Sequence, residues 1–354
     1  MTWRDCRLGD FMRLQRGHDL PAQDREDGEV PVVSSSGITG HHSKEKAAAP
    51  GVVTGRYGTL GEVFYLDRAY WPLNTALYVT DFKGNDPKFT AYFLRNVLKD
   101  YQSDKAAVPG IDRNVLHELK VRSPDLPLQL RIVDVLAAYD DLIDNNRRRI
   151  KLLEDSVRLL FDEWFVRLAF PGHAPSAVID GVPTGWSQVA LDQVLLLQRG
   201  FDLPSQDREA GDVPIYGSTG IVGFHNKAKV TGPGLVTGRS GSLGEVHFVA
   251  QDFWPLNTAL WVKEFKRATP LFALHLLRGM RLEKYNGGVS VPTLDRKVVH
   301  KAEVLLPAVS VMQRFESAAD DVYLQINTLT AMNEKLRTAR DLLLPRLMSG
   351  ELTV

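Results

Sequence analysis

Residues 16–26 read RGHDLPAQDRE, and residues 199–209 read RGFDLPSQDRE, so only two positions differ. The offset between the two stretches is 183 residues, and it does not drift along the chain. TGR at residues 54–56 returns at 237–239, and WPLNTAL at 71–77 returns unchanged at 254–260. A single register over so long a span predicts a tandem duplication. The function is therefore expected to be one that two copies of a unit perform together.

The composition of the 354 residues is that of an ordinary globular protein, with 44% hydrophobic and 24% charged residues. No apolar run is long enough for a membrane span, so no membrane partner is expected. The one cysteine, Cys6, excludes an internal disulfide and predicts a cytoplasmic location. The 43 basic and 43 acidic residues cancel, which argues against binding nucleic acid by bulk charge alone. Reading of bases by local loops stays possible.

Each copy begins with a strand-rich segment. Apolar spacing over residues 89–101 predicts one helix in the first copy. Short β-rich runs broken by serine and glycine predict strands at residues 30–33, 51–54, 62–65, 76–79 and 115–121. These features predict a mixed α+β domain with long polar loops.

A long helical pattern follows each globular segment. Apolar residues recur every three or four positions over residues 132–164, with Asn146 as one polar interruption. The matching seam over residues 315–347 is interrupted by Asn333 and Arg340. A helix with such a seam needs a partner helix, and the two are expected to pair in antiparallel fashion. That pairing would relate the two units by a pseudo-twofold axis.

These sequence patterns divide the chain into globular residues 1–127, a helix at 128–170, a linker at 171–185, globular residues 186–308 and a helix at 309–354. Pro345 is expected to kink or end the second helix. The seam residues expected to bind the partner helix are Ile132, Leu136, Ile143, Asn146, Leu153 and Trp164 in the first helix, and Phe315, Val322, Ile326, Leu336 and Leu343 in the second.

Short motifs in a fixed order link the whole chain to a known family. They are Gly37-Ile38 after a serine stretch, VTGRYG at 53–58, WPLNT at 71–75, QLRI at 129–132, LFDEWF at 160–165 and QRF at 313–315, together with the second copies of the first three. With these motifs the chain resembles the DNA-specificity subunits of type I restriction-modification systems.

The resemblance implies two target-recognition domains, at 1–127 and 186–308, alternating with two helical spacers. It implies double-stranded DNA as a partner, methyltransferase subunits in two copies, and motor-nuclease restriction subunits. Each domain would read one half of a bipartite, near-palindromic target while the helices set the gap. No cofactor and no catalytic residue are expected in this chain.

The loop at residues 16–26 has the chemistry of direct base readout. Arginine can fork onto guanine, glutamine can bond adenine twice, and the serines at 34–36 can serve either base. The alternative is a self-contained turn in which Asp19, Asp24 and Arg25 form ion pairs. In the TGR motifs, arginine could reach a phosphate or could brace the loop through backbone carbonyls. For Asn74-Thr75, buried hydrogen bonding is expected over DNA contact.

The candidate DNA-binding residues of the first copy are Arg16, Asp19, Gln23, Arg25, Ser34, Ser35, Ser36, Thr54, Arg56, Tyr57 and Arg113. Those of the second copy are Arg199, Asp202, Gln206, Arg208, Tyr216, Ser218, Thr219, Thr237, Arg239, Ser240 and Arg296.

Other functions have less support in the sequence. There is no GxxxxGK[ST] phosphate loop, no Asn-Pro-Pro-aromatic motif and no glycine-rich turn for S-adenosylmethionine. His41, His42 and His225 lack cysteine or carboxylate partners at metal-ligand spacing, so solvent-facing loop histidines are expected instead. Two rival functions remain: a protein-binding scaffold of two β-rich modules on a coiled coil, and an enzyme of two fused catalytic copies.

Overall fold

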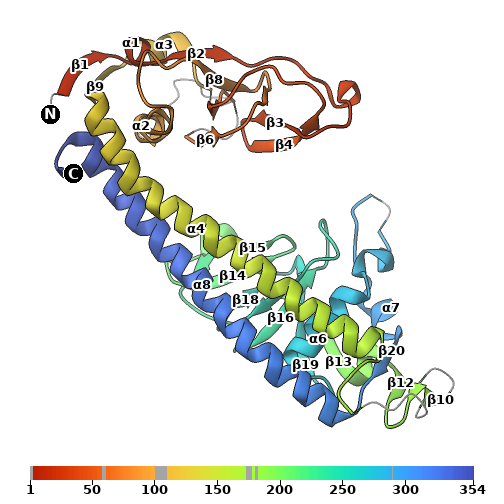
Figure 1. Ribbon diagram of the computed structural model, residues 1–354. Helices are drawn as coiled ribbons and strands as arrows, with labels where there is room; N and C mark the ends of the chain where they lie inside the picture. Colours follow the sequence, from red (N-terminus) through yellow and green to blue (C-terminus); the bar gives the residue numbers. More distant parts are fainter. Residues whose placement is uncertain (1–2, 58–60, 100–109, 173–177, 180–181, 289) are drawn as a thin grey trace. The chain divides into compact units, whose positions relative to one another are not determined.

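The computed structural model describes residues 3–57, 61–99, 110–172, 178–179, 182–288 and 290–354 (Figure 1). The chain divides into two compact units. Unit 1 contains Met1–Asn145 and Met332–Val354, and unit 2 contains Asn146–Ala331. Each unit therefore holds one copy of the repeat and a part of both long helices. The five-part division drawn from the sequence stays a prediction, as does the pseudo-twofold axis.

Unit 1 has a four-stranded antiparallel sheet at its centre. Its strands lie in the order β2 (Arg13–Arg16), β8 (Ala76–Asp81), β5 (Gly51–Gly55) and β6 (Val63–Leu66). Further described strands of the unit are β4 (Gly37–His42), β3 (Val30–Ser34) and β7 (Trp71–Pro72) in one sheet, and β1 (Trp3–Arg7) with β9 (Lys120–Pro124) in another. Four of the predicted strands are thus confirmed, as β3, β5, β6 and β8.

Unit 2 repeats this topology strand for strand. Its four-stranded sheet has the order β13 (Leu195–Arg199), β19 (Ala259–Phe265), β16 (Gly234–Gly238) and β17 (Val246–Val249). The smaller sheets are β15 (Gly220–His225), β14 (Val213–Gly217) and β18 (Trp254–Pro255), then β12 (Ser187–Ala190) with β20 (Glu303–Leu306). Within the predicted linker, β10 (Val178–Ile179) pairs with β11 (Val182–Pro183).

Short helices complete each unit. They are α1 (Leu8–Phe11), α2 (Pro87–Lys99) and α3 (Arg113–Glu118) in unit 1, and α5 (Leu191–Val194), α6 (Pro270–Gly279) and α7 (Arg296–His300) in unit 2. The 3-10 turns are η1 (Ala22–Asp24), η4 (Ser205–Asp207) and η5 (Leu282–Tyr285). Helix α2 matches the helix predicted at 89–101, of which residues 100 and 101 lie outside the described residues.

The strand predicted at residues 115–121 is wrong, because α3 occupies this segment up to Glu118 and the strand β9 begins at Lys120. The cause is local. The Asp112 side chain accepts a hydrogen bond of 2.9 Å from the backbone N–H of Asn114 and so caps the start of the helix. This cap decides the segment against the β preference of its valines.

Two long helices follow the globular copies. Helix α4 spans Leu126–Phe161 and continues into a π-helical turn at Asp162–Val166, while α8 spans Val309–Ser349. Pro345 does not end the second helix, because α8 continues for four residues beyond it; the alternative that Pro345 kinks the helix stays a prediction. Leu344, Leu347 and Met348 are buried there in the core of unit 1, which offsets the hydrogen bond that proline lacks. Among the described helices, none is apolar enough over a sufficient length to cross a bilayer.

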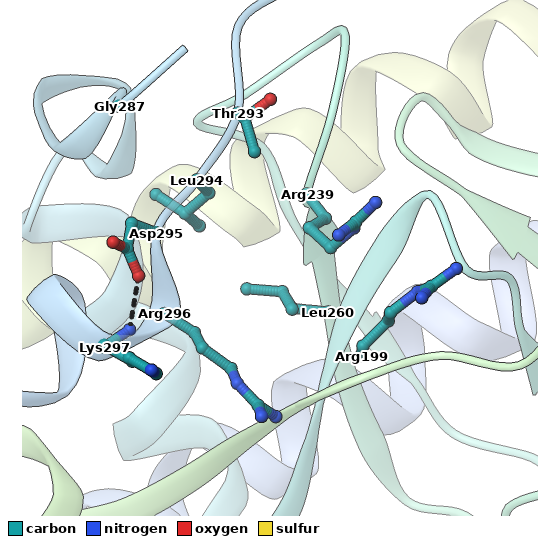
Figure 2. A pocket seen from close by; sticks show the side chains of 9 residues that line it. All are labelled: Arg199, Arg239, Leu260, Gly287, Thr293, Leu294, Asp295, Arg296 and Lys297. Atoms are coloured by element: carbon teal, nitrogen blue, oxygen red, sulfur yellow. Dashed lines mark hydrogen bonds between the residues drawn. The ribbon is translucent and has the colours of Figure 1, made fainter.

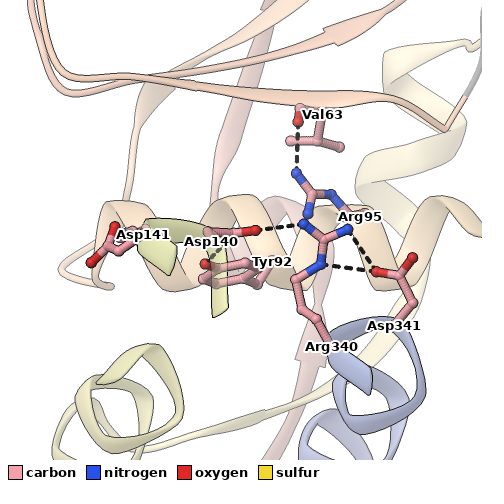
Figure 3. A network of polar contacts seen from close by, with 8 residues as sticks. Val63, Tyr92, Arg95, Asp140, Asp141, Arg340 and Asp341 are labelled. Carbon is pink, nitrogen blue, oxygen red and sulfur yellow. Dashed lines mark hydrogen bonds and ion pairs between the residues drawn. The ribbon is translucent and has the colours of Figure 1, made fainter. Parts of the chain in front are cut away.

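In unit 1 the two helices pair in antiparallel fashion, and polar groups fix their register (Figure 3). Arg340 of α8 forms an ion pair with Asp140 of α4, and the same carboxylate accepts a hydrogen bond from the Tyr92 hydroxyl of α2. Further along, the Asn333 side chain donates to the carbonyl of Ile143 at 3.4 Å. The two interruptions of the second seam therefore have partners inside the unit.

In unit 2 the contacts between the two long helices are made mainly by aromatic side chains. The ring of Phe315 in α8 lies 5.7 Å from Phe161 and 5.2 Å from Phe165, measured between centroids. His275 and Tyr323, which occupy the positions of Tyr92 and Asp140, lie 3.4 Å apart between ring nitrogen and hydroxyl. Burial, together with nearby arginines, lowers the pKa of His275 from 6.5 to about 3. This histidine is therefore neutral at physiological pH.

Candidate nucleic-acid interface

The two most similar stretches of the repeat form one structural element. The backbone N–H of His18 donates to the carbonyl of Pro72 at 2.8 Å, and that of Asn74 donates to His18 at 3.0 Å. A Cβ added to Gly17 would lie 2.2 Å from the carbonyl oxygen of Leu73, so this close approach requires glycine. The loop that begins at residue 16 is thus held against the WPLNTAL segment.

An aspartate fixes this loop from its exposed side. Asp19 accepts a hydrogen bond from the Asn74 side chain and lies 3.9 Å from a guanidinium nitrogen of Arg16. The same contacts recur in unit 2 among Asp202, Asn257 and Arg199. The loop is therefore braced, as one alternative from the sequence proposed, but through Arg16 and Asn74. Arg25 instead donates to the carbonyl of Thr39 at 3.2 Å.

Strand register brings arginines from distant segments to one end of the sheet. In unit 1, Arg16 of β2 pairs with Leu77 of β8. Leu77 also pairs with Thr54 of β5, which lies two residues before Arg56. The backbone N–H of Ile111 donates to the carbonyl of Arg56 at 2.9 Å, which places the start of α3 with Arg113 beside this edge. Three candidate arginines thus come from three elements that meet.

In unit 2 the equivalent arginines line a cleft of about 390 Å³ (Figure 2). Arg199, Arg239 and Arg296 surround Leu260 there, and Lys297 adds a fourth cation. The further lining residues are Gly287, Thr293, Leu294 and Asp295. As in unit 1, a backbone bond joins the segments, here from Leu294 N–H to the carbonyl of Arg239 at 2.8 Å.

The electrostatics of this cleft favour an anionic ligand. The Asp295 carboxylate accepts from the backbone N–H of Lys297 at 2.9 Å and so caps α7. Arg239 donates through Nε to the carbonyl of Asn257 at 2.9 Å, which uses one of its donors to brace the loop. In unit 1, by contrast, the guanidinium of Arg56 lies 4.5 Å from the ring centroid of Tyr57. In the cleft of unit 2, the four cations Arg199, Arg239, Arg296 and Lys297 outnumber the carboxylates of Asp295 and Asp202.

Four candidate residues are buried, and three of them donate to backbone inside the protein. The Thr54 hydroxyl donates to Glu62 at 2.8 Å, and the Thr237 hydroxyl donates to Glu245 at 2.7 Å. Ser34 donates to Gly37 at 3.3 Å, and the fourth buried candidate is Tyr216.

The other candidates are accessible. Exposed ones are Arg16, Asp19, Gln23, Ser36, Arg113, Arg199, Asp202, Gln206, Thr219 and Arg296. Half-buried ones are Arg25, Ser35, Arg56, Tyr57, Arg208, Ser218, Arg239 and Ser240. Their contact with DNA stays a prediction.

The prediction of solvent-facing histidines is wrong for His42 and His225, which are both buried. The Nδ1 atom of His42 accepts the backbone N–H of Glu26 at 3.0 Å, and that of His225 accepts the N–H of Glu209 at 3.1 Å. His41 is exposed. Across the described part of the chain, no group of three or more histidine, cysteine or acidic side chains could hold a metal ion.

Sequence reasoning missed Lys297, because the residue before it is repeated but the lysine is not. It also missed Lys46 and Lys229, whose ammonium groups lie 5.7 Å and 5.5 Å from the ring centroids of Trp71 and Trp254. Each of these tryptophans begins a WPLNTAL segment. Lys46 and Lys229 are separated by the repeat offset of 183 residues, and this was the signal available in the sequence for the pair.

Comparison with known proteins gives one consistent family. The family model of the type I restriction modification DNA specificity domain matches residues 1–155. The type I restriction enzyme MjaIX specificity subunit of Methanocaldococcus jannaschii is 24% identical over 295 residues, which cover 75% of this chain and 68% of that protein. The type I restriction enzyme HindI specificity subunit of Haemophilus influenzae is 20% identical over an alignment that covers 71% of this chain and 73% of that protein.

A solved structure shares the fold. The crystal structure of a type I restriction-modification S subunit from M. genitalium aligns with a TM-score of 0.57 at 16% identity. The alignment covers 98% of this chain and 96% of that chain.

Proposed function

Because the chain belongs to the family of type I restriction-modification DNA specificity subunits, we propose that each of its two units reads one half of a split DNA target. The observation that carries this function is the arginine arrangement shared by the units. Arg16 and Arg199 end equivalent strands, and the backbone of Arg56 or Arg239 is bonded to the segment that leads into α3 or α7. Arginine is the side chain best suited to both guanine edges and phosphates.

Two units on one chain explain how modest contacts can give high specificity. The net charge of zero supports little binding through phosphates alone. When both half-sites are present, the second contact becomes intramolecular and the two binding free energies combine. Because the repeated loops are nearly identical, we expect similar half-sites in inverted orientation. Symmetry can break where the copies differ, as at Tyr57 and Ser240.

The long helices are the proposed spacer. At about 1.5 Å per residue, the 36 residues of α4 and the 41 residues of α8 correspond to helices of roughly 54 Å and 62 Å. Their exposed outer faces carry Leu159 and Leu342, which occupy equivalent positions of the repeat and are 58% and 66% exposed. We propose that two methyltransferase subunits dock along this spacer, one for each half-site. Motor-nuclease restriction subunits would join the same assembly.

Methylation and cleavage belong to those partners in this proposal, and the chain itself only recognises DNA. A gel shift with the assembled complex tests recognition directly. Duplexes that carry the target should bind far more tightly than scrambled duplexes, and the affinity should fall as salt rises. Equal affinity for both duplexes, or binding of protein partners with no effect of DNA, would favour the scaffold alternative. Methyl transfer from S-adenosylmethionine by the chain alone would contradict the non-catalytic role.

A further inference from the structure

The two units differ in one cation of the arginine cluster. Lys297 lines the cleft of unit 2, and the equivalent residue of unit 1, 183 positions earlier, is Asn114. The three arginines of the cleft all have arginine counterparts in unit 1. Unit 2 thus carries one additional positive charge at the second residue of its short helix α7.

We propose that the cleft of unit 2 seats a backbone phosphodiester of DNA and that Lys297 supplies a phosphate contact at a position where unit 1 has Asn114. This inference rests on the proposed function and adds an asymmetry to it. Unit 2 is the more firmly anchored of the two reading units, and its half-site is the more salt-dependent one. The two halves of a near-palindromic target are then held with unequal strength.

The charge of the cleft identifies its ligand as a phosphate and not as a base edge. One arginine fork satisfies the acceptors of a guanine, and a base edge is neutral. Arg199, Arg239, Arg296 and Lys297 line this cleft of about 390 Å³, and the carboxylates near them are those of Asp295 and of Asp202, which lies 3.7 Å from Arg199, so four cations face two anions. The two positive charges in excess favour an anionic ligand, and the phosphodiester is the charged group of DNA.

Lys297 is suited to this contact by its position as well as its charge. Its side chain is exposed, while its backbone N–H is bonded to the Asp295 carboxylate and fixes the start of the helix. Lysine carries a point charge on a flexible stem, which adapts to a phosphate without the fixed fork geometry of an arginine. Because the cap uses only the backbone of Lys297, changing its side chain leaves the fold of the cleft in place.

The experiment compares Lys297→Asn with Lys301→Asn in the full chain assembled with its modification subunits. Both variants remove one exposed lysine charge from the same short segment, but Lys301 does not line the cleft. Association constants are measured from 50 to 200 mM salt, on a duplex with the mapped target and on a scrambled duplex. Lys297→Arg, which keeps the charge, is the conservative variant.

For Lys297→Asn we expect the slope of log K against log salt to fall in magnitude by about 0.9, the value for one phosphate. The ratio of the association constant of the unmodified chain to that of Lys297→Asn should therefore fall about 3.5-fold between 50 and 200 mM salt. The deficit should be the same on both duplexes, so that the ratio of target to scrambled binding is unchanged. Lys301→Asn and Lys297→Arg should both keep the slope of the unmodified chain.

Three results would overturn the proposal. They are an unchanged slope for Lys297→Asn, an equal loss of slope in Lys301→Asn, and a loss of discrimination at one base pair without a change of slope. Failure of the proposed function looks different. In that case the unmodified complex shows no preference for the target, whereas the salt slopes on the scrambled duplex still report on the phosphate contact.

Discussion

One buried histidine of unit 2, His275, should make that unit sensitive to acid. His275 is 3% exposed, and its ring lies 5.5 Å from that of Phe161 between centroids. The perturbation is a fall in pH, compared between the unmodified chain and His275→Tyr. Tyrosine is the residue that unit 1 has at the equivalent position, Tyr92. It does not titrate between pH 3 and 7.

The sign and size of the effect follow from the pKa. The pKa of His275 is about 3 in the folded chain against 6.5 for an unperturbed histidine. The folded state therefore binds fewer protons than the unfolded state, and the free energy of unfolding rises with pH across this window. Its stability contribution is complete above pH 6.5 and is lost as the pH falls toward 3. At pH 5 the loss amounts to about 2 kcal/mol.

The assay is urea denaturation at several pH values, with hydrogen exchange to assign the unfolding to unit 2. His247 and His300 of the same unit also have a pKa lowered by burial. The quantity measured is therefore the difference in pH dependence between the two chains. Between pH 7 and pH 5, His275→Tyr should lose about 2 kcal/mol less than the unmodified chain. Parallel pH profiles would refute the reasoning, whatever the absolute stability of the variant.

Three further predictions concern the helices and the arginines. Arg340→Val introduces the residue of the equivalent position and leaves Asp140 without its ion-pair partner. Urea denaturation should show that it lowers the free energy of unfolding of unit 1 by about 2–3 kcal/mol, less than for a fully buried pair because the two side chains are 17% and 28% exposed. Adding Asp140→Tyr, the residue at the equivalent position of unit 2, should recover most of the lost stability. An Arg340→Val variant as stable as the original chain would contradict the prediction. Inserting four residues beside Asn146 adds about 6 Å of helix and close to one turn. Methylome mapping should then show a slightly longer gap with unchanged half-sites, and altered half-sites with the old gap would argue against a spacer. Arg239→Ala should weaken binding of the target by about 1–3 kcal/mol in gel shifts, and full affinity would exclude this arginine from the interface.

Much of the architecture could be predicted because the sequence states it twice. A constant offset of 183 residues indicated the two copies, and strands such as β3 and β5 lie where β-rich runs end in serine or glycine. The same repetition selected Arg199, Arg239 and Arg296, which the fold then brings to one cleft.

What the sequence could not predict depends on contacts between distant segments. Arg340 looked like a break in the seam, because its partner Asp140 becomes visible only once the antiparallel register is known. His42 looked like a loop residue, because the backbone N–H that it accepts belongs to Glu26, which lies on another segment. Lys297 was missed for the opposite reason, since selection by repetition overlooks what only one copy has.

The central claim is that this chain reads a split DNA target with two similar units. Methylome sequencing of a host that expresses the chain with its modification subunits tests it most directly. The account predicts methylated adenines in a motif of two similar, inverted half-sites around a gap of fixed length, and the loss of this motif when the chain is omitted. A single uninterrupted motif, two halves that share no bases, or the same methylation without the chain would contradict it.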